Sequence, residues 1–303
     1  MYNRLLSTHS SLPGILKASA STALSPEILR LPMSGSSSLP LPTREAFKTI
    51  SKGNSLLERY GMTETGMILS CGLSMENRID GAVGWPLPGV DVRLVSTETS
   101  QPISADAVDE EGEVQVRGPT IFTGYWRNPT ASSEAFVPPS SSDTNQAPWF
   151  RTGDIAVRRQ SASTSEGPDV AWANGPCYYI LGRNSIDIIK TGGEKVSALE
   201  IEREMLGLPE VKEVAVVGIK SERWGQKVGA VVVLDEAFSR ELAHRDQRWG
   251  AMDVRRGLRG RLAGWKLPHV VEVVEGGLRR NAMGKVDKKR LLKDIFPENE
   301  EVQ

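Results

Sequence analysis

The chain has 303 residues, with 37 Lys and Arg against 38 Asp and Glu, so its formal net charge is −1. Hydrophobic residues make up 39% and charged residues 25%, as in ordinary globular domains. The balanced charge gives no support to nucleic-acid binding, and two cysteines cannot build a disulfide framework or a four-ligand zinc site. At roughly 150 residues per domain, the length predicts two domains.

The first 59 residues predict short helices around a polar turn. Residues 25–30 and 43–50 each open on Ser or Thr, which are good helix N-caps, and residues 34–40 read as a flexible turn. The first 26 residues are rich in Ser and Ala and superficially fit an organelle transit peptide. No apolar run reaches the length of a membrane span, which requires about 18 residues.

The middle of the chain predicts a small β-subdomain. Between residues 81 and 154, the segments 90–95 and 112–117 alternate apolar and polar side chains with the period of a strand. The segments 138–148 and 160–169 are polar and almost lack large apolar side chains, which favours surface loops.

The last third predicts a compact α+β domain, because strands and helices follow one another without regular alternation. The expected strands are 178–181, 213–219, 227–234 and 270–274, and the expected helices are 197–206, 253–263 and 287–295. Ser197 and Glu200 have the spacing of a capping box. We place the boundary at residues 182–185, which predicts domains 1–183 and 184–303.

Two motifs of the first domain carry residues suited to a nucleotide. In residues 60–66, glycines let backbone amides approach an anion, threonine hydroxyls can donate to phosphate, and Glu64 is a natural Mg²⁺ ligand. Asp154 follows a glycine turn before an apolar strand, where a carboxylate can accept both ribose hydroxyls. Ordinary capping turns are the alternative for both motifs.

Two further motifs lie in the second domain. In residues 182–195 a lysine, Lys190, precedes paired glycines, and the alternative is a β-hairpin with a Gly-Gly turn and solvated charges. In residues 279–286 a glycine turn fixes Lys285, whose charge could neutralise a phosphate or carboxylate. A solvated basic turn is the alternative there.

The four motifs together resemble the adenylate-forming superfamily of acyl- and aryl-CoA synthetases, luciferases and peptide-synthetase adenylation domains, over residues 1–295. Residues 57–64, 84–90 and 188–201 look most like the malonyl-CoA synthetase branch. The resemblance implies an α/β plus α+β fold: the end of the large adenylate-forming domain with its β-subdomain, followed by a small mobile C-terminal α+β domain.

The resemblance also implies a role for each motif residue. The nucleotide-binding residues would be Gly35, Ser36 and Ser37 along the adenine, Tyr60, Gly61, Asp154 at the ribose, and Arg183. The catalytic residues would be Thr63 at the α-phosphate, Glu64 holding Mg²⁺, Lys285 in the adenylation step and Lys190 in thioester formation, with Gly192 and Gly193 facing CoA and Ser185 at the hinge.

The implied activity is that of an ATP-dependent acid–CoA ligase, with ATP, Mg²⁺ and CoA, acting on malonate or another small carboxylic acid. Arg30 and Arg59 are candidates for the second carboxylate of malonate. The family's phosphate loop ending in Pro-Lys-Gly has no match, so we expect the C-terminal part of a longer enzyme, missing the N-terminal part of the large domain. A catalytically inactive remnant that binds a nucleotide or a partner is the alternative. We expect the cytoplasm or the mitochondrial matrix, since no peroxisomal signal ends the chain.

Overall fold

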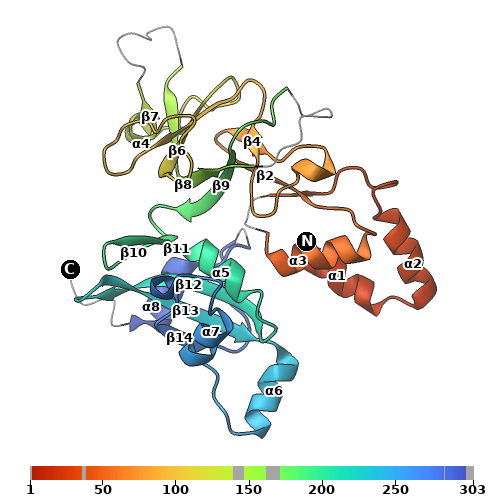
Figure 1. Ribbon diagram of the computed structural model, residues 1–303. Helices are drawn as coiled ribbons and strands as arrows, with labels where there is room; N and C mark the ends of the chain where they lie inside the picture. Colours follow the sequence, from red (N-terminus) through yellow and green to blue (C-terminus); the bar gives the residue numbers. More distant parts are fainter. Residues whose placement is uncertain (1, 36–38, 139–146, 162–170, 283, 298–303) are drawn as a thin grey trace. The chain divides into compact units, whose positions relative to one another are not determined.

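The computed structural model describes residues 2–35, 39–138, 147–161, 171–282 and 284–297. The chain divides into two compact units, Met1–Ile180 and Leu181–Gln303. Figure 1 colours the first unit from red to green and the second from green to blue. Each unit has its own sheets and its own buried core. None of the helices in the described part of the chain has the length and hydrophobicity needed to cross a bilayer.

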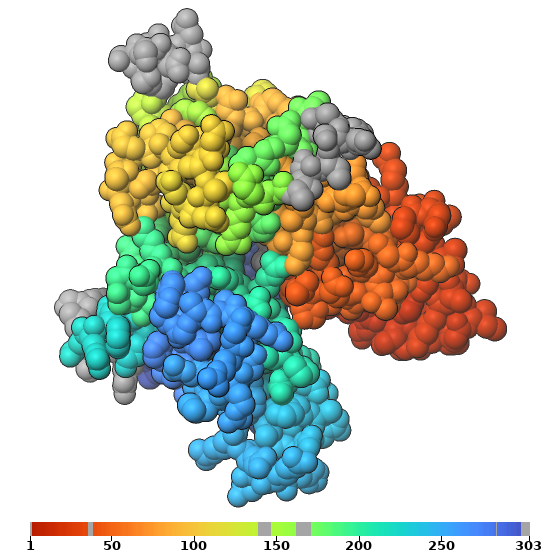
Figure 2. All heavy atoms as spheres, viewed as in Figure 1, coloured from red at the N-terminus to blue at the C-terminus, as the bar shows by residue number. Residues whose placement is uncertain are grey.

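A helical layer opens the first unit. Its helices are α1 (Tyr2–Ser11), α2 (Gly14–Ala23) and α3 (Leu41–Ile50), and the unit also holds α4 (Pro129–Ala135) and a short 3-10 helix, η1 (Met75–Asn77). Phe47 is fully buried and meets the ring of Tyr2 edge-on, at 5.4 Å between centroids, which fastens α1 to α3. In Figure 2 this layer is the continuous red and orange part of the surface.

The helix predicted over residues 25–30 is wrong. This segment is a turn, in which Leu29 N–H donates to the Ser25 carbonyl at 2.8 Å and the Ser25 hydroxyl donates to Glu27. Ser25 therefore does not cap a helix but closes a single turn on its own side chain. The helix predicted over 43–50 is confirmed within α3.

Two sheets complete the first unit. One has the order β1-β2-β3-β4, with β1 (Met33–Ser34), β2 (Leu57–Met62), β3 (Gly66–Ser70) and β4 (Trp85–Pro86). The other has the order β5-β6-β8-β7, with β5 (Asp91–Val95), β6 (Glu111–Arg117), β7 (Phe136–Val137) and β8 (Trp149–Arg159), and β9 (Cys177–Arg183) also pairs with β8. The predicted strands 90–95, 112–117 and 178–181 are thus confirmed. The predicted loops 138–148 and 160–169 lie mostly outside the described residues.

The second unit is a five-stranded sheet with helices on both faces. Its strands are β10 (Ile188–Thr191), β11 (Glu194–Ser197), β12 (Val211–Ser221), β13 (Gly225–Leu234) and β14 (Val270–Val273), in the order β11-β10-β13-β12 with β14 parallel to β13. Its helices are α5 (Ala198–Met205), α6 (Glu236–His244), α7 (Ala251–Gly257), α8 (Lys288–Ile295) and a 3-10 helix, η2 (Gly264–Lys266).

The alternation of apolar residues along β13 explains the two covered faces. Val228, Ala230 and Val232 pack in one core with residues of α5 and α7, while Val231 and Val233 pack in another with Leu291 of α8. Successive side chains of a strand point to opposite faces, so a continuous valine run requires cover on both. Strands 213–219, 227–234 and 270–274 and helix 287–295 are confirmed.

Two details of the helices differ from the predictions. The helix expected over 253–263 is α7, which ends at Gly257, and Gly260 follows in the left-handed region with φ of 80°. The predicted capping box forms only in its first half: Ser197 Oγ accepts from Glu200 N–H at 3.1 Å, but the Glu200 carboxylate binds Lys266 at 2.7 Å. Helix α6, N-capped by Asp235, was not predicted.

Candidate active site

A hydrogen bond between distant residues marks the candidate nucleotide site of the first unit. The Tyr60 hydroxyl, on β2, donates to Asp154 Oδ2, on β8, at 2.6 Å, although 94 residues separate them in the chain. Asp154 is 8% exposed, and its backbone N–H donates to Thr152 Oγ1 at 3.1 Å. The fold thus brings together two residues that the sequence placed in the same site for separate reasons.

Asp154 does not follow a turn, as the sequence predicted, but lies inside the long strand β8. Gly153, with φ of 74°, interrupts the regular strand just before it, and the pairing register between β6 and β8 shifts at the same point. The Thr152 hydroxyl fills the gap by donating to the Val114 carbonyl at 2.8 Å. Such a bulge re-aims one side chain while the strand continues, and here that side chain is Asp154.

The segment 60–66 is a tight β-hairpin between β2 and β3 rather than an open loop. A Cβ atom at Gly61 would lie 2.1 Å from the Gly66 carbonyl oxygen, so only glycine fits there. Thr65 is buried, and its hydroxyl staples the turn by donating to the Gly66 carbonyl at 3.1 Å. Thr63 is exposed and Glu64 half-buried at the tip, so these two can meet a ligand.

A second segment supports Glu64 from the side. Phe122 N–H donates to the Glu64 carbonyl at 2.8 Å, and the Tyr125 hydroxyl lies 3.4 Å from Glu64 Oε1. Tyr125 was not predicted as a site residue, because no spacing rule links residues so far apart in the chain.

Glu64 is suited to share a magnesium ion with a nucleotide rather than to hold one alone. No group of three or more His, Cys, Asp or Glu side chains gathers in a way that could hold a metal among the residues described. Mg²⁺ in nucleotide sites commonly takes one or two carboxylates together with phosphate oxygens and water. The half-buried Glu64 carboxylate at the hairpin tip could supply one such ligand.

Gly35 lies beside strand β2. A Cβ atom there would be 3.3 Å from the Arg59 carbonyl, and β1 pairs with β2 in parallel up to Ser34 opposite Glu58. Gly35 therefore lies beside Arg59, the residue before Tyr60 on β2. Ser36 and Ser37, which were predicted to lie along the adenine together with Gly35, are outside the described residues. Arg59 is half-buried and Arg30 exposed.

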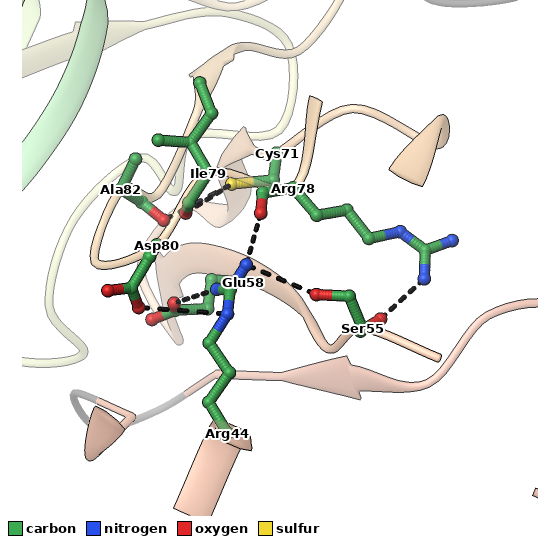
Figure 3. Close-up of polar contacts among 8 residues, drawn as sticks. All are labelled: Arg44, Ser55, Glu58, Cys71, Arg78, Ile79, Asp80 and Ala82. Carbon is green, nitrogen blue, oxygen red and sulfur yellow. Dashed lines mark hydrogen bonds and ion pairs between the residues drawn. The ribbon is translucent and has the colours of Figure 1, made fainter. Parts of the chain in front are cut away.

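A buried ionic network fixes β2 just before Tyr60 (Figure 3). Arg44 of α3 pairs with Glu58 at 3.1 Å and also donates to the Arg78 carbonyl and to Ser55 Oγ. Arg44 and Glu58 are both about 6% exposed, so losing either partner would leave a buried charge, a cost of about 3–5 kcal/mol. Since Glu58 and Tyr60 are two residues apart on one strand, the network helps to hold the tyrosine in place.

Cys71 lies at the edge of this network. Burial, and then the nearby Glu58 charge, raises the pKa of its thiol to about 12. Such a thiol is an inert packing residue rather than a nucleophile.

In the second unit, residues 188–197 form the β-hairpin that the sequence analysis held as an alternative. Gly192 and Gly193 have φ of 61° and 89°, the conformation of a type I′ turn. Gly192 N–H donates to the Trp224 carbonyl at 2.9 Å, and a Cβ atom on Gly192 would lie 3.1 Å from the Trp224 ring. Lys190 is exposed on β10 while its backbone N–H donates to Gln226 Oε1 at 2.7 Å.

Lys285 lies in a separate, well-braced turn. Its N–H donates to Asn281 Oδ1 at 3.0 Å, its carbonyl accepts from Asn281 N–H at 2.8 Å, and Gly284 has φ of 78°. The Lys285 side chain is exposed, so the turn presents the ammonium outward.

Arg183 and Ser185 lie in an exposed turn at the start of the second unit. The Arg183 carbonyl accepts from Asp187 N–H at 2.8 Å and from Ile186 N–H at 3.2 Å. Ser185, the predicted hinge residue, is therefore enclosed in a hydrogen-bonded turn rather than in an open linker.

Comparison with known proteins agrees with this arrangement. Residues 1–126 match the family described as AMP-binding enzyme, and residues 200–285 match the AMP-binding enzyme C-terminal domain. A CoA ligase of Gibberella moniliformis is 48% identical, over 100% of this chain and 50% of its own length. The mitochondrial malonate–CoA ligase of Mus musculus is 42% identical, over 93% of this chain and 45% of its own.

A solved structure gives the same fold. ATP-bound MatB from Rhodopseudomonas palustris superposes with a TM-score of 0.69 at 31% identity, covering 97% of this chain and 53% of that one. The chain spans about half the length of the curated relatives it matches.

The chain belongs to the adenylate-forming, AMP-binding enzyme family. Within that family its relatives are acid–CoA ligases, and it matches the malonyl-CoA synthetase branch, as its motifs indicated.

Proposed function

We propose that the protein is an ATP-dependent acid–CoA ligase that uses malonate or a similarly small carboxylic acid. The observation that carries this proposal is the Tyr60–Asp154 hydrogen bond beside the Thr63–Glu64 hairpin tip. A ribose-binding carboxylate, a phosphate-binding hydroxyl and a magnesium-binding carboxylate are the groups that a bound ATP requires. The malonate–CoA ligase of mouse supports the choice of acid.

The reaction has two steps. A carboxylate oxygen of the acid attacks the α-phosphorus of ATP, the bond to pyrophosphate breaks, and an acyl-adenylate forms. The sulfur of CoA then attacks the acyl carbon, and AMP leaves. The first step brings anions together, so it needs cations that stabilise the developing charge.

Each residue of the first unit has a distinct task in the proposal. Asp154 accepts the ribose hydroxyls, Tyr60 holds that carboxylate in one orientation, and Gly35 leaves room along the adenine. Thr63 donates to the α-phosphate and Glu64 binds Mg²⁺. The ion, when bound, would neutralise phosphate charge.

The second unit supplies the mobile cations. Lys285 bridges the acid and the α-phosphate in the first step, and Arg183 assists at the ribose or the phosphate. The hairpin of Lys190, Gly192 and Gly193 faces CoA in the second step, after a rotation that the family resemblance places near Ser185. Arg30 and Arg59 remain the candidates for the second carboxylate of malonate.

The test is turnover by the protein, purified as its complete natural chain, with ATP, Mg²⁺, CoA and a series of acids: malonate, methylmalonate, acetate, succinate and benzoate. Formation of malonyl-CoA and AMP, in preference to the products of the other acids, supports the proposal. ATP binding by calorimetry without AMP formation from any acid would overturn it and favour a nucleotide-binding module.

We also infer that the protein works in the mitochondrial matrix or the cytoplasm, and the mouse relative, which is named as mitochondrial, supports the first of these. A fluorescent fusion of the protein, imaged with markers of both compartments, tests this. Accumulation in any other compartment would contradict it.

A further inference from the structure

A largely buried ionic cluster lies in the second unit, made by Lys288, Asp187 and Glu202, none of which has been given a role above. Lys288 Nζ, at the start of α8, is 2.6 Å from Asp187 Oδ1 and 2.7 Å from Glu202 Oε1 of α5. The Lys288 side chain is 11% exposed and both carboxylates are 15% exposed. Burial alone would lower the pKa of the Lys288 ammonium, but the two carboxylates outweigh it and raise that pKa. The ammonium therefore stays charged between two acids.

One side of the cluster closes the turn that follows β9. Asp187 Oδ2 accepts from Arg183 N–H at 3.0 Å, and the Asp187 carbonyl accepts from Ala198 N–H at 2.7 Å. Gly182 packs so tightly that a Cβ atom there would lie 2.4 Å from Asp187 Cβ. Through Asp187, the turn at residues 183–187 is fastened to the ammonium of Lys288.

The other side of the cluster anchors the Lys285 turn. Lys288 follows Lys285 by three residues, so the cluster holds the end at which the chain leaves the turn. At the other end, Arg280 Nη2 pairs with Glu213 of β12 at 2.6 Å, and Arg280 Nη1 donates to the Gly284 carbonyl at 3.1 Å. The turn is thus held to the second unit by ion pairs before Lys285, of Arg280 with Glu213 and of Arg279 with Asp294, and by the cluster after it.

We propose that Lys288 and Asp187 are positioning residues, which fix the Lys285 turn and the 183–187 turn to a single body, so that the placement of Lys285 depends on the Asp187–Lys288 pair. This inference rests on the proposed role of Lys285 in adenylation. Neither residue touches the substrate in this scheme. Their effect is geometric, because a displaced cation loses much of its transition-state contact.

Asp187→Asn is the sharpest test. A carboxylate serves Lys288 with one oxygen and Arg183 N–H with the other, whereas an amide has only one acceptor oxygen and must give up one of the two. Lys288 keeps Glu202, so no buried charge is left alone and the unit should fold. The matched control is Glu200→Gln, the same chemical change in another ion pair of the unit, the one with Lys266.

The first readout is the adenylation half-reaction, measured as malonate-dependent exchange of pyrophosphate into ATP. Asp187→Asn is expected to lower its kcat about 10- to 100-fold, with the KM for ATP changed less than about twofold. Glu200→Gln should leave both constants unchanged. Lys288→Arg should keep most of the rate, because it retains the charge that faces Asp187 and Glu202.

The second readout is amide hydrogen exchange, which does not depend on turnover. Asp187→Asn should speed exchange of the Arg183 and Lys285 amides, and Glu200→Gln should not. Unchanged exchange at Lys285 would overturn the proposal.

Lys285→Ala separates failure of this proposal from failure of the proposed function. If Lys285→Ala abolishes pyrophosphate exchange while Asp187→Asn stays within twofold of the parent, the positioning role is wrong and the proposed function stands. If Lys285→Ala has no effect, the role of Lys285 falls and the positioning role falls with it.

Discussion

Tyr60→Phe removes a single hydroxyl from the candidate nucleotide site and leaves the ring in place. That hydroxyl donates to Asp154 Oδ2 at 2.6 Å, and the accepting side chain is almost fully buried. Hydrogen bonds to charged groups contribute about 1.5–3 kcal/mol, so we expect the first unit to lose stability within that range. A less firmly held Asp154 should also bind ribose less well, and we expect roughly tenfold weaker ATP binding, or about 1.4 kcal/mol.

The measurements are native-state hydrogen exchange of the β2 amides for stability and calorimetry with ATP and Mg²⁺ for affinity. Tyr125→Phe is the matched control for stability: it deletes a hydroxyl whose contact with Glu64 is 3.4 Å long and exposed, so the loss of stability should be small. If Tyr60→Phe costs no more stability than Tyr125→Phe and binds ATP as the parent does, Tyr60 does not hold Asp154 for a ligand.

Four further predictions follow from individual side chains. Lys285→Ala should slow adenylate formation about 10²- to 10³-fold and spare thioester formation from supplied acyl-adenylate, and Lys190→Ala should do the opposite. Single-turnover kinetics of each half-reaction measure both effects. Equal losses in the two half-reactions would show that Lys285 and Lys190 do not serve separate steps. Burial raises the pKa of Glu202 above its ordinary value of 4.5, so the folded unit holds that proton more tightly than the unfolded chain does. The folded unit should therefore lose stability as pH rises from about 4.5 through the raised pKa. In urea unfolding between pH 4 and 8, the free energy of unfolding should fall less steeply with pH in Glu202→Gln than in the parent. The Cys71 thiol, with a pKa of about 12, should resist N-ethylmaleimide at pH 8 until urea is added, and rapid labelling of the folded protein would contradict its burial. Ile201→Ala, at a fully buried position of α5, should destabilise the second unit by about 2–5 kcal/mol, and a loss below 1 kcal/mol in thermal unfolding would mean that its core is loosely packed.

The sequence predicted the strands well, because the apolar pattern that marks a strand lies within a few adjacent residues. The alternation in residues 112–117 and the valine run in residues 227–234 both mark strands, although Glu113 and Gln115 are buried along with the valines of the first segment. Helices were harder to predict. Helices α1 and α2 are rich in Ser, Thr and other weak helix formers, and much of their stability comes from contacts such as Tyr2 on Phe47, which no short window of sequence contains.

The site divides in the same way. Thr63, Glu64 and the Gly192–Gly193 turn stand out as motifs, but their arrangement depends on contacts between distant segments. Tyr60 meets Asp154 across 94 residues, and Lys288 meets Asp187 across 101. The latter pair lacked any local signal, since a lysine at a helix start and an aspartate after a glycine turn are common on solvated surfaces.

Glu202 has one more consequence, at the margin of the second sheet. No described strand pairs with the outer edge of β12, whose middle, residues 214–217, reads Val-Ala-Val-Val and favours strand addition. The Glu202 carboxylate accepts from Val216 N–H on this strand at 2.7 Å, which removes the central donor that an incoming strand would need. The acid that pairs with Lys288 therefore also occupies a backbone donor at the edge of β12, and its loss would leave the Val216 N–H open to an incoming strand.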